Sequence, residues 1–215
     1  MKLIRLPGVH TPVSDTWLLA EAARREHLAG ARFVDLCTGT GALAIAAAHE
    51  GAGQVVAVDL TRRAVLTAFI NARLNRARVD VRRGDLFAPL AGETFDVIVS
   101  NPPYIPAASD RLPRHGRRVA LDAGRNGRAL IDRICAGAPA HLNPGGVLLI
   151  VHSSICGIDR TCGIMSDAGL EPGVVAEQYG PLGPVMTERA PMLRERGLLG
   201  THDAEVVVVV RGEMP

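Results

Sequence analysis

The sequence predicts an α/β fold in which a doubly wound, mostly parallel sheet carries helices on both faces. Seven short aliphatic runs alternate with helical segments along the 215 residues, which is the pattern of repeated strand–helix units. Aromatic residues make up only 3% of a chain that is 47% hydrophobic, so Val, Leu, Ile and Ala must fill the core, as they do in buried parallel strands. Polar residues directly follow four of the strands, and ligands bind at that end of such a sheet.

The elements of the first half follow one another closely. An amphipathic helix is predicted over residues 16–28, where Ser14 or Asp15 could cap its start and Gly30 could end it. The segments after it are predicted as strands over 32–37, 54–58, 78–82 and 95–100 and as helices over 42–50 and 61–75.

The second half contains the longest irregular segment, residues 104–124, which is rich in Pro, Gly and Arg. Long ordered loops of compact domains are often functional. A helix is predicted over 127–142, stopped by Asn143-Pro144-Gly145-Gly146. The remaining elements are strands over 147–152, 173–178 and 206–210 and a helix over 157–168.

Length and charge narrow the class of protein. The length fits one domain over residues 1–215, with an N-terminal segment and helix over 1–30 and a core over 31–215. The formal net charge of +2 predicts no global attraction to nucleic acid or membranes. No signal peptide and no membrane span of about 18 apolar residues is visible, so we expect a cytoplasmic protein.

The cysteines give no sign of a metal site. Cys37, Cys135, Cys156 and Cys162 form no CxxC pair and have no His at zinc-finger spacing. We expect all four to be reduced thiols that behave as small apolar residues, and we expect no bound metal.

A glycine-rich turn, Asp35-Leu36-Cys37-Thr38-Gly39-Thr40-Gly41, joins the first predicted strand to the next helix. Glycine lets the backbone approach a ligand closely, and the helix start offers free N–H groups to an anionic group. With Ala44, the turn also satisfies the looser G-x-G-x-x-A pattern of dinucleotide sites. The alternative is a tight turn that binds nothing.

Two acidic residues follow the next strands. Asp59 ends the second strand and could accept hydrogen bonds from the hydroxyls of a ribose, although it could equally cap the helix over 61–75. Asp85 could accept from an adenine amino group while Leu86 and Phe87 cover the ring; the alternative is an Asp that stabilises its own turn.

The most informative motif is Asn101-Pro102-Pro103-Tyr104, directly after the fourth predicted strand. The prolines fix the backbone and lack N–H donors, so their carbonyls and the Asn side-chain oxygen form a cluster of acceptors. Such a cluster can hold both hydrogens of an NH₂ group, and Tyr104 offers a flat face to a planar group. The alternative is a rigid turn without a ligand.

Taken in order, these motifs resemble those of the class I methyltransferases of the NPPY group over about residues 31–104. Residues 13–19 (VSDTWLL) resemble the SDT/EDT-x-LL segment of HemK-type protein-glutamine methyltransferases, which modify the Gly-Gly-Gln loop of peptide-chain release factors. Residues 121–127 (LDAGRNG) are similar to the ALDGG-x-DG segment of that family. Asp122 would then shape the substrate mouth, unless it caps a helix at 127.

The resemblance implies a Rossmann-like class I methyltransferase fold with seven strands and S-adenosyl-L-methionine as cofactor. The residues that it implies for cofactor binding are Asp15, Thr16, Asp35, Thr38, Gly39, Thr40, Gly41, Asp59, Leu60, Asp85, Leu86 and Asn101. Those implied for catalysis are Asn101, Pro102, Pro103 and Tyr104. The expected substrate is a release factor, methylated on a glutamine side-chain nitrogen.

The short N-terminal region is closer to the single-domain branch of the family, known from archaea and eukaryotes, than to the bacterial enzymes with an extra helical domain. Members of that branch often pair with a small zinc-binding activator protein, so an activator is a candidate partner.

Three other functions stay open at the level of sequence. NPPY also serves adenine-N6 methylation, and residues 105–133 contain seven Arg against three Asp that could contact nucleic acid, although such a set is more often a solvated face. A small molecule could be the substrate, with the long loop as a lid. An NAD-binding module would leave NPPY unexplained. His152 and Trp17 are expected to be structural and packing residues.

Overall fold

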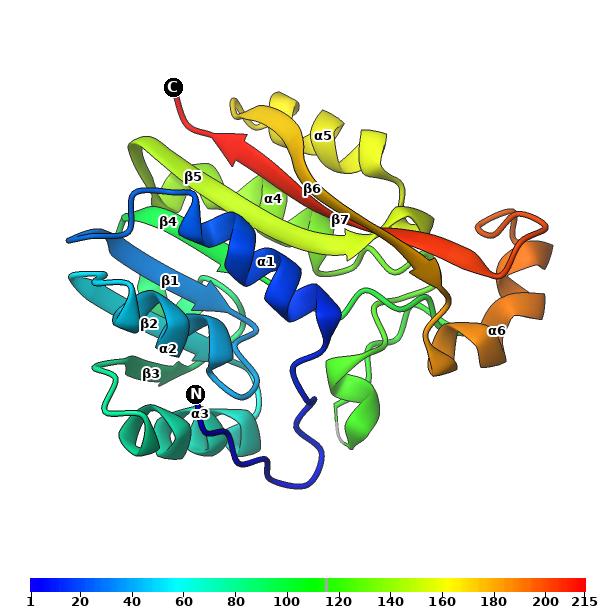
Figure 1. Cartoon of the computed structure of the whole chain (residues 1–215). Coiled ribbons are helices and arrows are strands. Elements are labelled where there is room, and N and C mark those ends of the chain that lie inside the picture. Colours follow the sequence, from blue (N-terminus) through cyan, green and yellow to red (C-terminus); the bar gives the residue numbers. More distant parts are fainter. Residues whose placement is uncertain (115) are drawn as a thin grey trace.

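A computed structural model describes residues 1–114 and 116–215. Its centre is a seven-stranded sheet with the strand order β3-β2-β1-β4-β5-β7-β6 (Figure 1). The strands are β1 (Arg32–Leu36), β2 (Gln54–Asp59), β3 (Asp80–Arg83), β4 (Phe95–Ser100), β5 (Leu142–Ser153), β6 (Glu171–Pro181) and β7 (Ala204–Glu213). The helices are α1 (Ser14–Arg24), α2 (Ala42–His49), α3 (Arg62–Leu74), α4 (Ile131–Gly137), α5 (Ile158–Asp167) and α6 (Pro184–Glu195).

The prediction of a mostly parallel sheet is confirmed. β1 pairs in parallel with β2 and β4, and β5 continues the parallel set beside β4. Only β7 runs against its neighbours, β5 on one side and β6 on the other. The carboxyl ends of β1, β2, β3 and β4 therefore share one edge, as the sequence predicted.

Helices cover both faces because the central strands alternate between two apolar layers. Val34 and Leu36 pack in the layer under α4 and α5, whereas Phe33 packs in the layer under α1 and α2. All three side chains are almost fully buried, as expected for a strand covered on both sides. In Figure 1, α1 crosses the front of the sheet and α4 and α5 lie behind it.

Glycine and a threonine cap fix the geometry between α2 and α3. Gly41 adopts φ +81, and a Cβ there would lie 3.1 Å from the Cβ of Ala68 on α3, so only glycine allows both the turn and the close packing. Thr61 caps α3 by accepting a hydrogen bond from the Ala64 N–H at 3.2 Å.

The predicted caps of the first helix are wrong. Ser14 and Asp15 lie inside α1, and its N-cap is Val13, whose carbonyl accepts from the Thr16 N–H at 3.0 Å. The helix ends at Arg24 rather than near Gly30. The Asp15 carboxylate instead accepts a hydrogen bond from the Tyr104 hydroxyl.

The predicted helix over 127–142 is also wrong in extent. Gly127 has φ +75, a left-handed conformation that cannot continue a helix, and α4 occupies only Ile131–Gly137. β5 already begins at Leu142, which pairs with Phe95 of β4. The Asn-Pro-Gly-Gly run is therefore part of an irregular start of β5.

The sequence did not predict α6, because this helix contains Pro184 and Pro191 and has few apolar side chains. Pro184 occupies the first turn, where the missing N–H costs nothing. Met186, Ala190 and Leu193 of α6 form a separate apolar cluster that Tyr104 packs against.

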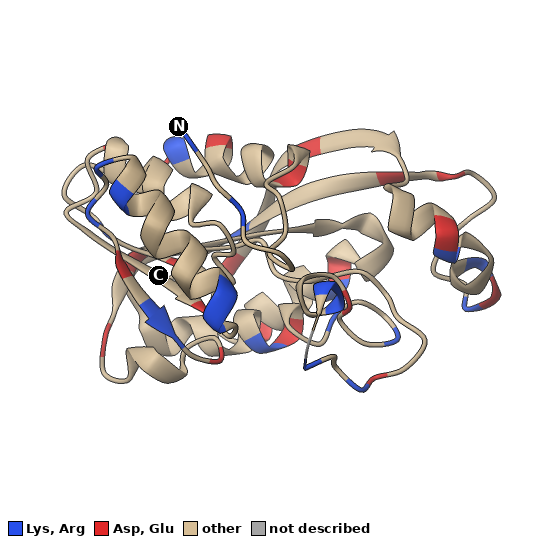
Figure 2. Ribbon diagram, turned by 90° about the horizontal axis from the view of Figure 1, so that it is seen from below, with Lys and Arg blue, Asp and Glu red and all other residues tan. Residues whose placement is uncertain are grey.

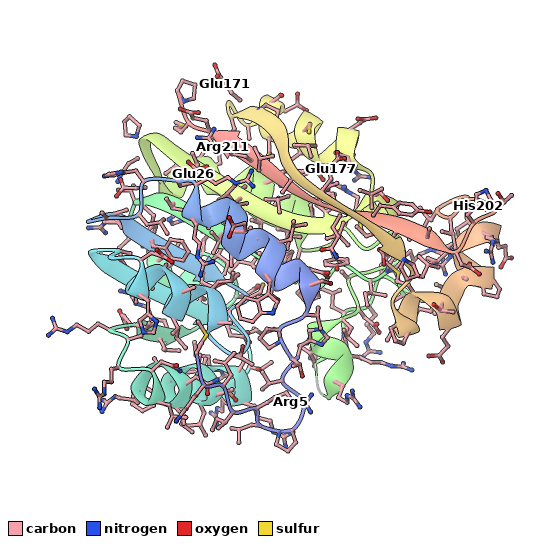
Figure 3. The ribbon with its side chains drawn as sticks, viewed as in Figure 1. Arg5, Glu26, Glu171, Glu177, His202 and Arg211 are labelled. Carbon is pink, nitrogen blue, oxygen red and sulfur yellow. The ribbon has the colours of Figure 1, made fainter. Side chains whose placement is uncertain are left out.

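The N-terminal region is fastened to the core at two places. Asn71 of α3 accepts from the Ile4 N–H at 2.8 Å and donates to its carbonyl at 3.0 Å. Glu26, just after α1, forms an ion pair with Arg211 of β7 at 2.8 Å, and the two side chains face each other in Figure 3. In the described part of the chain, no helix is long and apolar enough to cross a membrane.

Three further expectations have clear outcomes. The four cysteines are free thiols. His152 is fully buried and shares a hydrogen bond of 3.0 Å with Thr161, and burial lowers its pKa to about 4, which fits a structural residue. Trp17, expected to be a packing residue, is 46% exposed, so much of its side chain is open to solvent.

Candidate functional site

A cavity of about 1380 Å³ opens where β1, β2, β3 and β4 end. Its other walls come from the N-terminal segment, the loop after β4, and the ends of β6, β7 and α6. All but two of the residues implied for cofactor binding and catalysis line it; the exceptions are Asp35, which lies fully buried beneath the glycine turn, and Gly41. The structure thus brings together residues from 15 to 104 along the chain.

The glycine turn is held by two carboxylates. Asp35 accepts from the Thr38 hydroxyl at 2.5 Å and from the Ala44 N–H at 3.3 Å with one oxygen. Its other oxygen is buried without a partner among the described residues, and burial raises the pKa of Asp35 to about 7. Asp59 accepts from the Gly39 N–H at 3.0 Å and so ties the turn to β2.

Asp59 does not cap α3, because Thr61 does. Instead, one Asp59 oxygen accepts from the Thr61 N–H at 2.9 Å while the carboxylate lines the cavity. Burial raises the pKa of Asp59, and hydrogen bonds from Thr61 and Gly39 oppose that rise. The Asp59 side chain therefore keeps a place on the cavity wall as well as a structural role.

The loop after β3 departs from expectation at one residue. Asp85 and Leu86 line the cavity, but Phe87 stacks on His141 with a centroid distance of 4.6 Å and does not line it. Asp85 also pairs with Arg133 at 2.9 Å, with both side chains about half exposed. Leu86 adopts φ +50, which places a buried apolar side chain at this wall.

The NPPY residues face α1 across the cavity. The Asn101 side-chain NH₂ donates to the Thr16 hydroxyl at 3.1 Å, and the Tyr104 hydroxyl donates to Asp15. Burial and the neighbouring Asp15 carboxylate raise the pKa of Tyr104 well above its ordinary value, so the phenol keeps its proton. The first turn of α1 thus orients both ends of the motif.

Tyr104 is also held from behind. The Cys156 thiol donates to its carbonyl at 3.2 Å, and a Cβ on Gly127 would lie 2.3 Å from the same oxygen. Arg128, only 2% exposed, donates to the Cys156 carbonyl at 2.6 Å. Arg128 was predicted as part of a solvated arginine face, and this is wrong for that residue.

The loop after Tyr104 is clamped by α6. Arg189 donates to the Pro106 carbonyl at 2.7 Å and pairs with Asp122 at 2.8 Å, and Arg196 donates to the Ala107 carbonyl at 2.7 Å. Asp122 is 8% exposed and does not cap α4, whose N-cap is Leu130. Asp122 does not line the cavity, and its ion pair with Arg189 holds it beside the loop.

The rest of that loop carries free arginines. Arg111 and Arg114 line the cavity, and the blue positions on this loop stand at the lower right of Figure 2. Within the described ranges, neither forms an ion pair. The predicted irregular segment 104–124 is confirmed apart from a short 3₁₀ turn at Arg117–Ala120, and residue 115 lies outside the described residues.

Sequence reasoning missed the wall opposite the glycine turn. The residues it missed there are Gln178, Gly180, Pro181, Gly183, Pro184, Val185, Met186, Glu205 and Val207, and on the N-terminal side Gly8, Val9, His10, Thr11 and Pro12. No local motif marks them, because their proximity depends on how β6, β7 and α6 return to the NPPY loop.

The strand-end residues fit the cofactor that the sequence implies. The N–H groups of Ala42 and Leu43 at the start of α2 have no acceptor among the residues described, so they are free for an anionic group. Asp59 and Asp85 present carboxylates on one side of the cavity, with Leu86 as an apolar cover beside them.

Comparison with known proteins agrees with these motifs. The family profile described as the methyltransferase small domain matches residues 4–116. The chain is 33% identical over 190 residues to a putative protein N5-glutamine methyltransferase of Methanocaldococcus jannaschii, and the match covers 88% of this chain and 95% of that protein.

A release factor glutamine methyltransferase of Geobacter sulfurreducens is 39% identical over 150 residues, which cover 67% of this chain and 53% of the bacterial protein. The chain therefore spans about half the length of that relative. Among solved structures, the chain is similar to the E. cuniculi Mtq2–Trm112 complex, which is described as responsible for methylation of the eRF1 translation termination factor. The match has a TM-score of 0.67 at 21% identity and covers 97% of this chain and 99% of the matched chain. At that identity the likeness concerns the fold.

Proposed function

The chain belongs to the methyltransferase small domain family, and from that premise we propose that it methylates the side-chain nitrogen of a glutamine in a peptide-chain release factor. It is an S-adenosylmethionine-dependent methyltransferase. The relatives described above carry names that specify glutamine as the acceptor, and the NPPY residues supply acceptors for an amide NH₂ group.

The observation that carries the proposal is the hydrogen bond between Asn101 and Thr16. The Asn101 NH₂ donates to the Thr16 hydroxyl at 3.1 Å and Asn101 lines the cavity, so in our proposal its side-chain oxygen is the group that accepts from the substrate. A primary amide offers two N–H donors. In our proposal one goes to Asn101 and the other to the Pro102 carbonyl, since neither proline has an N–H to compete.

This arrangement orients the acceptor nitrogen rather than activating it with a strong base. S-adenosylmethionine supplies an electrophilic methyl group on a sulfonium ion. The chain holds the amide so that its nitrogen faces that methyl group, and the fixed geometry lowers the barrier. A new N–C bond forms, the S–C bond breaks, and the nitrogen loses one proton to solvent. Tyr104, which lines the cavity, is assigned the role of offering its ring face to the planar amide.

Cofactor binding is assigned in the same proposal to the glycine turn and the strand-end acids. Asp59 accepts from the ribose hydroxyls, Asp85 and Leu86 hold the adenine, and the free N–H groups of α2 meet the carboxylate of the methionine part. Asp35 lies beneath the glycine turn and holds Thr38 and the start of α2 in position through its hydrogen bonds.

The test is methylation of a release factor by the full chain with labelled S-adenosylmethionine. We expect one methyl group on the glutamine of the Gly-Gly-Gln loop, located by mass spectrometry of the digested factor. A release factor with Gln→Ala at that position is the control and should stay unlabelled. Absence of label from the intact factor, both alone and with a small zinc-binding activator, overturns the proposal.

The other functions have less support. An NAD-binding module is excluded by the family, and an adenine or small-molecule acceptor is disfavoured because the relatives above are named for glutamine. The need for an activator and the cytoplasmic location stay predictions from the sequence.

A further inference from the structure

One wall of the cavity is almost entirely apolar and carries a single charged group. The wall is formed by the ends of β6 and β7 and by the start of α6. Its lining residues are Gln178, Gly180, Pro181, Gly183, Pro184, Val185, Met186, Glu205 and Val207. Pockets that bind a specific ligand combine an apolar lining with a few placed polar groups, and Glu205 is the charged one here.

The Glu205 carboxylate has only weak partners inside the protein. One oxygen accepts from the Gly183 N–H at 3.5 Å, the limit of a hydrogen bond. The other oxygen is buried and has no partner with hydrogen-bond geometry among the described residues, although the Ser153 hydroxyl lies near enough to oppose the rise in the Glu205 pKa that burial causes. A buried acceptor left unpaired costs free energy, so the protein alone does not explain why a carboxylate occupies this site.

The surroundings of Glu205 make the position still more costly. Asp15 is near enough that its negative charge adds to burial in raising the pKa of Glu205. The charge of Glu205 in turn contributes to the raised pKa of Tyr104. Glu205 therefore lies close to the NPPY motif. It pairs across the sheet with Gly180, which has no side chain to cover it.

We propose that Glu205 is a specificity-determining residue that accepts a hydrogen bond from a main-chain N–H of the acceptor segment, next to the residue that is methylated. The inference rests on the proposed function, since it needs a peptide in the cavity. Asn101 holds the side-chain amide and Glu205 holds the backbone that bears it. The enzyme then distinguishes a glutamine within a protein from a free amide of the same chemistry.

The experiment compares Glu205→Ala and Glu205→Gln with the unaltered protein, using a Gly-Gly-Gln loop peptide as acceptor. We expect KM for the peptide to rise about tenfold to a hundredfold in Glu205→Ala, the loss of a hydrogen bond to a charged group, with kcat within about twofold. Glu205→Gln keeps an oxygen acceptor without the charge, so its KM should lie between the two.

Thermal unfolding separates binding from a structural role. If Glu205 serves the substrate, Glu205→Gln should keep or raise the Tm of the free protein, because it removes a poorly paired buried charge. Glu177→Gln is the matched control: Glu177 lies on β6, is exposed, and does not line the cavity (Figure 3). It should change neither KM nor Tm.

A second peptide identifies the group that Glu205 contacts. Replacing the main-chain N–H groups beside the glutamine one at a time by N-methyl should raise KM at one position in the unaltered protein and have no further effect in Glu205→Ala.

Three results would overturn the inference: an unchanged KM in Glu205→Ala, a lower Tm in Glu205→Gln, or sensitivity only to cationic side chains of the peptide. If the unaltered protein methylates no glutamine at all, the proposed function fails instead, so the two failures are distinguishable.

Discussion

The cavity has two halves that are built in different ways. The cofactor half is made of the ends of β1, β2 and β3 with the start of α2, all from one continuous stretch of chain. The acceptor half is made of the NPPY loop, α6 and the ends of β6 and β7, which come from distant parts of the sequence.

The hydrogen bonds that hold the two halves differ in the distance along the chain between their partners. In the cofactor half, Asp35, Thr38 and Ala44 lie within nine residues of one another and hold the turn. In the acceptor half, Arg189 reaches across 83 residues to Pro106. The comparison teaches that the cofactor half is locally determined, whereas the acceptor half depends on the whole sheet being assembled. Substitutions in one half should therefore leave the other half's ligand unaffected.

The largest effect is expected from Asn101→Ala, in the acceptor half. Losing the oxygen that orients the amide should reduce kcat/KM for the acceptor by about 10²–10³-fold, the scale for removing one preorganised contact at a reacting group. Initial rates with a release factor measure this. Cofactor affinity should fall far less than this, because the Asp59 and Asp85 side is untouched and only the contribution of Asn101 to the cofactor site is lost.

Asn143→Ala is a matched control for Asn101→Ala, since Asn143 also bears an amide but bonds to Asp96 away from the cavity. Equal losses of rate in both variants would show that the effect is general destabilisation.

Asp59→Ala should act on the other half. It removes the acceptor for the ribose hydroxyls and releases the Gly39 N–H. We expect affinity for S-adenosylhomocysteine to fall by about 10²–10⁴-fold, the scale for losing two hydrogen bonds to a charged group. Calorimetry measures it. The acceptor KM, taken at saturating cofactor, should hold steady.

For Asp59→Ala the control is Asp167→Ala, an exposed acid at the end of α5. A large rise in the acceptor KM of Asp59→Ala would break the separation between the halves.

A pH dependence should mark the cofactor half. The pKa of Asp35 is about 7 in the folded chain against about 3.9 when unfolded. Between these values the folded state binds more protons, so stability is greatest in acid and falls as pH rises toward 7. From pH 5 to pH 8 this loss is on the order of 2–3 kcal/mol.

Asp35→Asn keeps an oxygen to accept from Thr38 and Ala44 but cannot ionise. Denaturant unfolding of the free protein at several pH values should show the variant gaining stability over the unaltered chain as pH rises. A parallel dependence in both proteins would contradict the assignment.

The smallest effect concerns the α6 clamp. Arg189→Ala removes the partner of Asp122, which is 8% exposed, and should lower the free energy of unfolding by about 2 kcal/mol, less than for a fully buried pair because Arg189 is partly exposed. We expect the acceptor KM to rise about tenfold with unchanged cofactor affinity, measured by initial rates and calorimetry.

Arg194→Ala on the same helix removes an exposed pair with Asp203 and hydrogen bonds to the Gly200 and Thr201 carbonyls, and it should change stability by less than about 1 kcal/mol because these contacts are exposed. If Arg194→Ala raises the acceptor KM as much as Arg189→Ala does, the contacts of Arg189 do not shape the acceptor half of the cavity.

The same division explains what the sequence could predict. The strand ends, the glycine turn and NPPY are short patterns whose chemistry is visible locally, and all of the residues that they imply for cofactor binding and catalysis, except Asp35 and Gly41, line one cavity. Glu205 carries no such pattern, because its position depends on the pairing of β7 with β6. α4 was predicted too long because the left-handed Gly127 is fixed by contact with Tyr104, and sequence alone does not show that contact.

The position of β7 has a consequence for the order in which the chain can fold during synthesis. β7 follows β6 and α6 along the chain, yet it lies between β5 and β6 and is the strand that β6 pairs with. β6 therefore has no place in the sheet until β7 has left the ribosome. The cofactor half can form on the nascent chain before then, whereas the acceptor half must wait for β7, so a product truncated before β7 would lack its substrate wall.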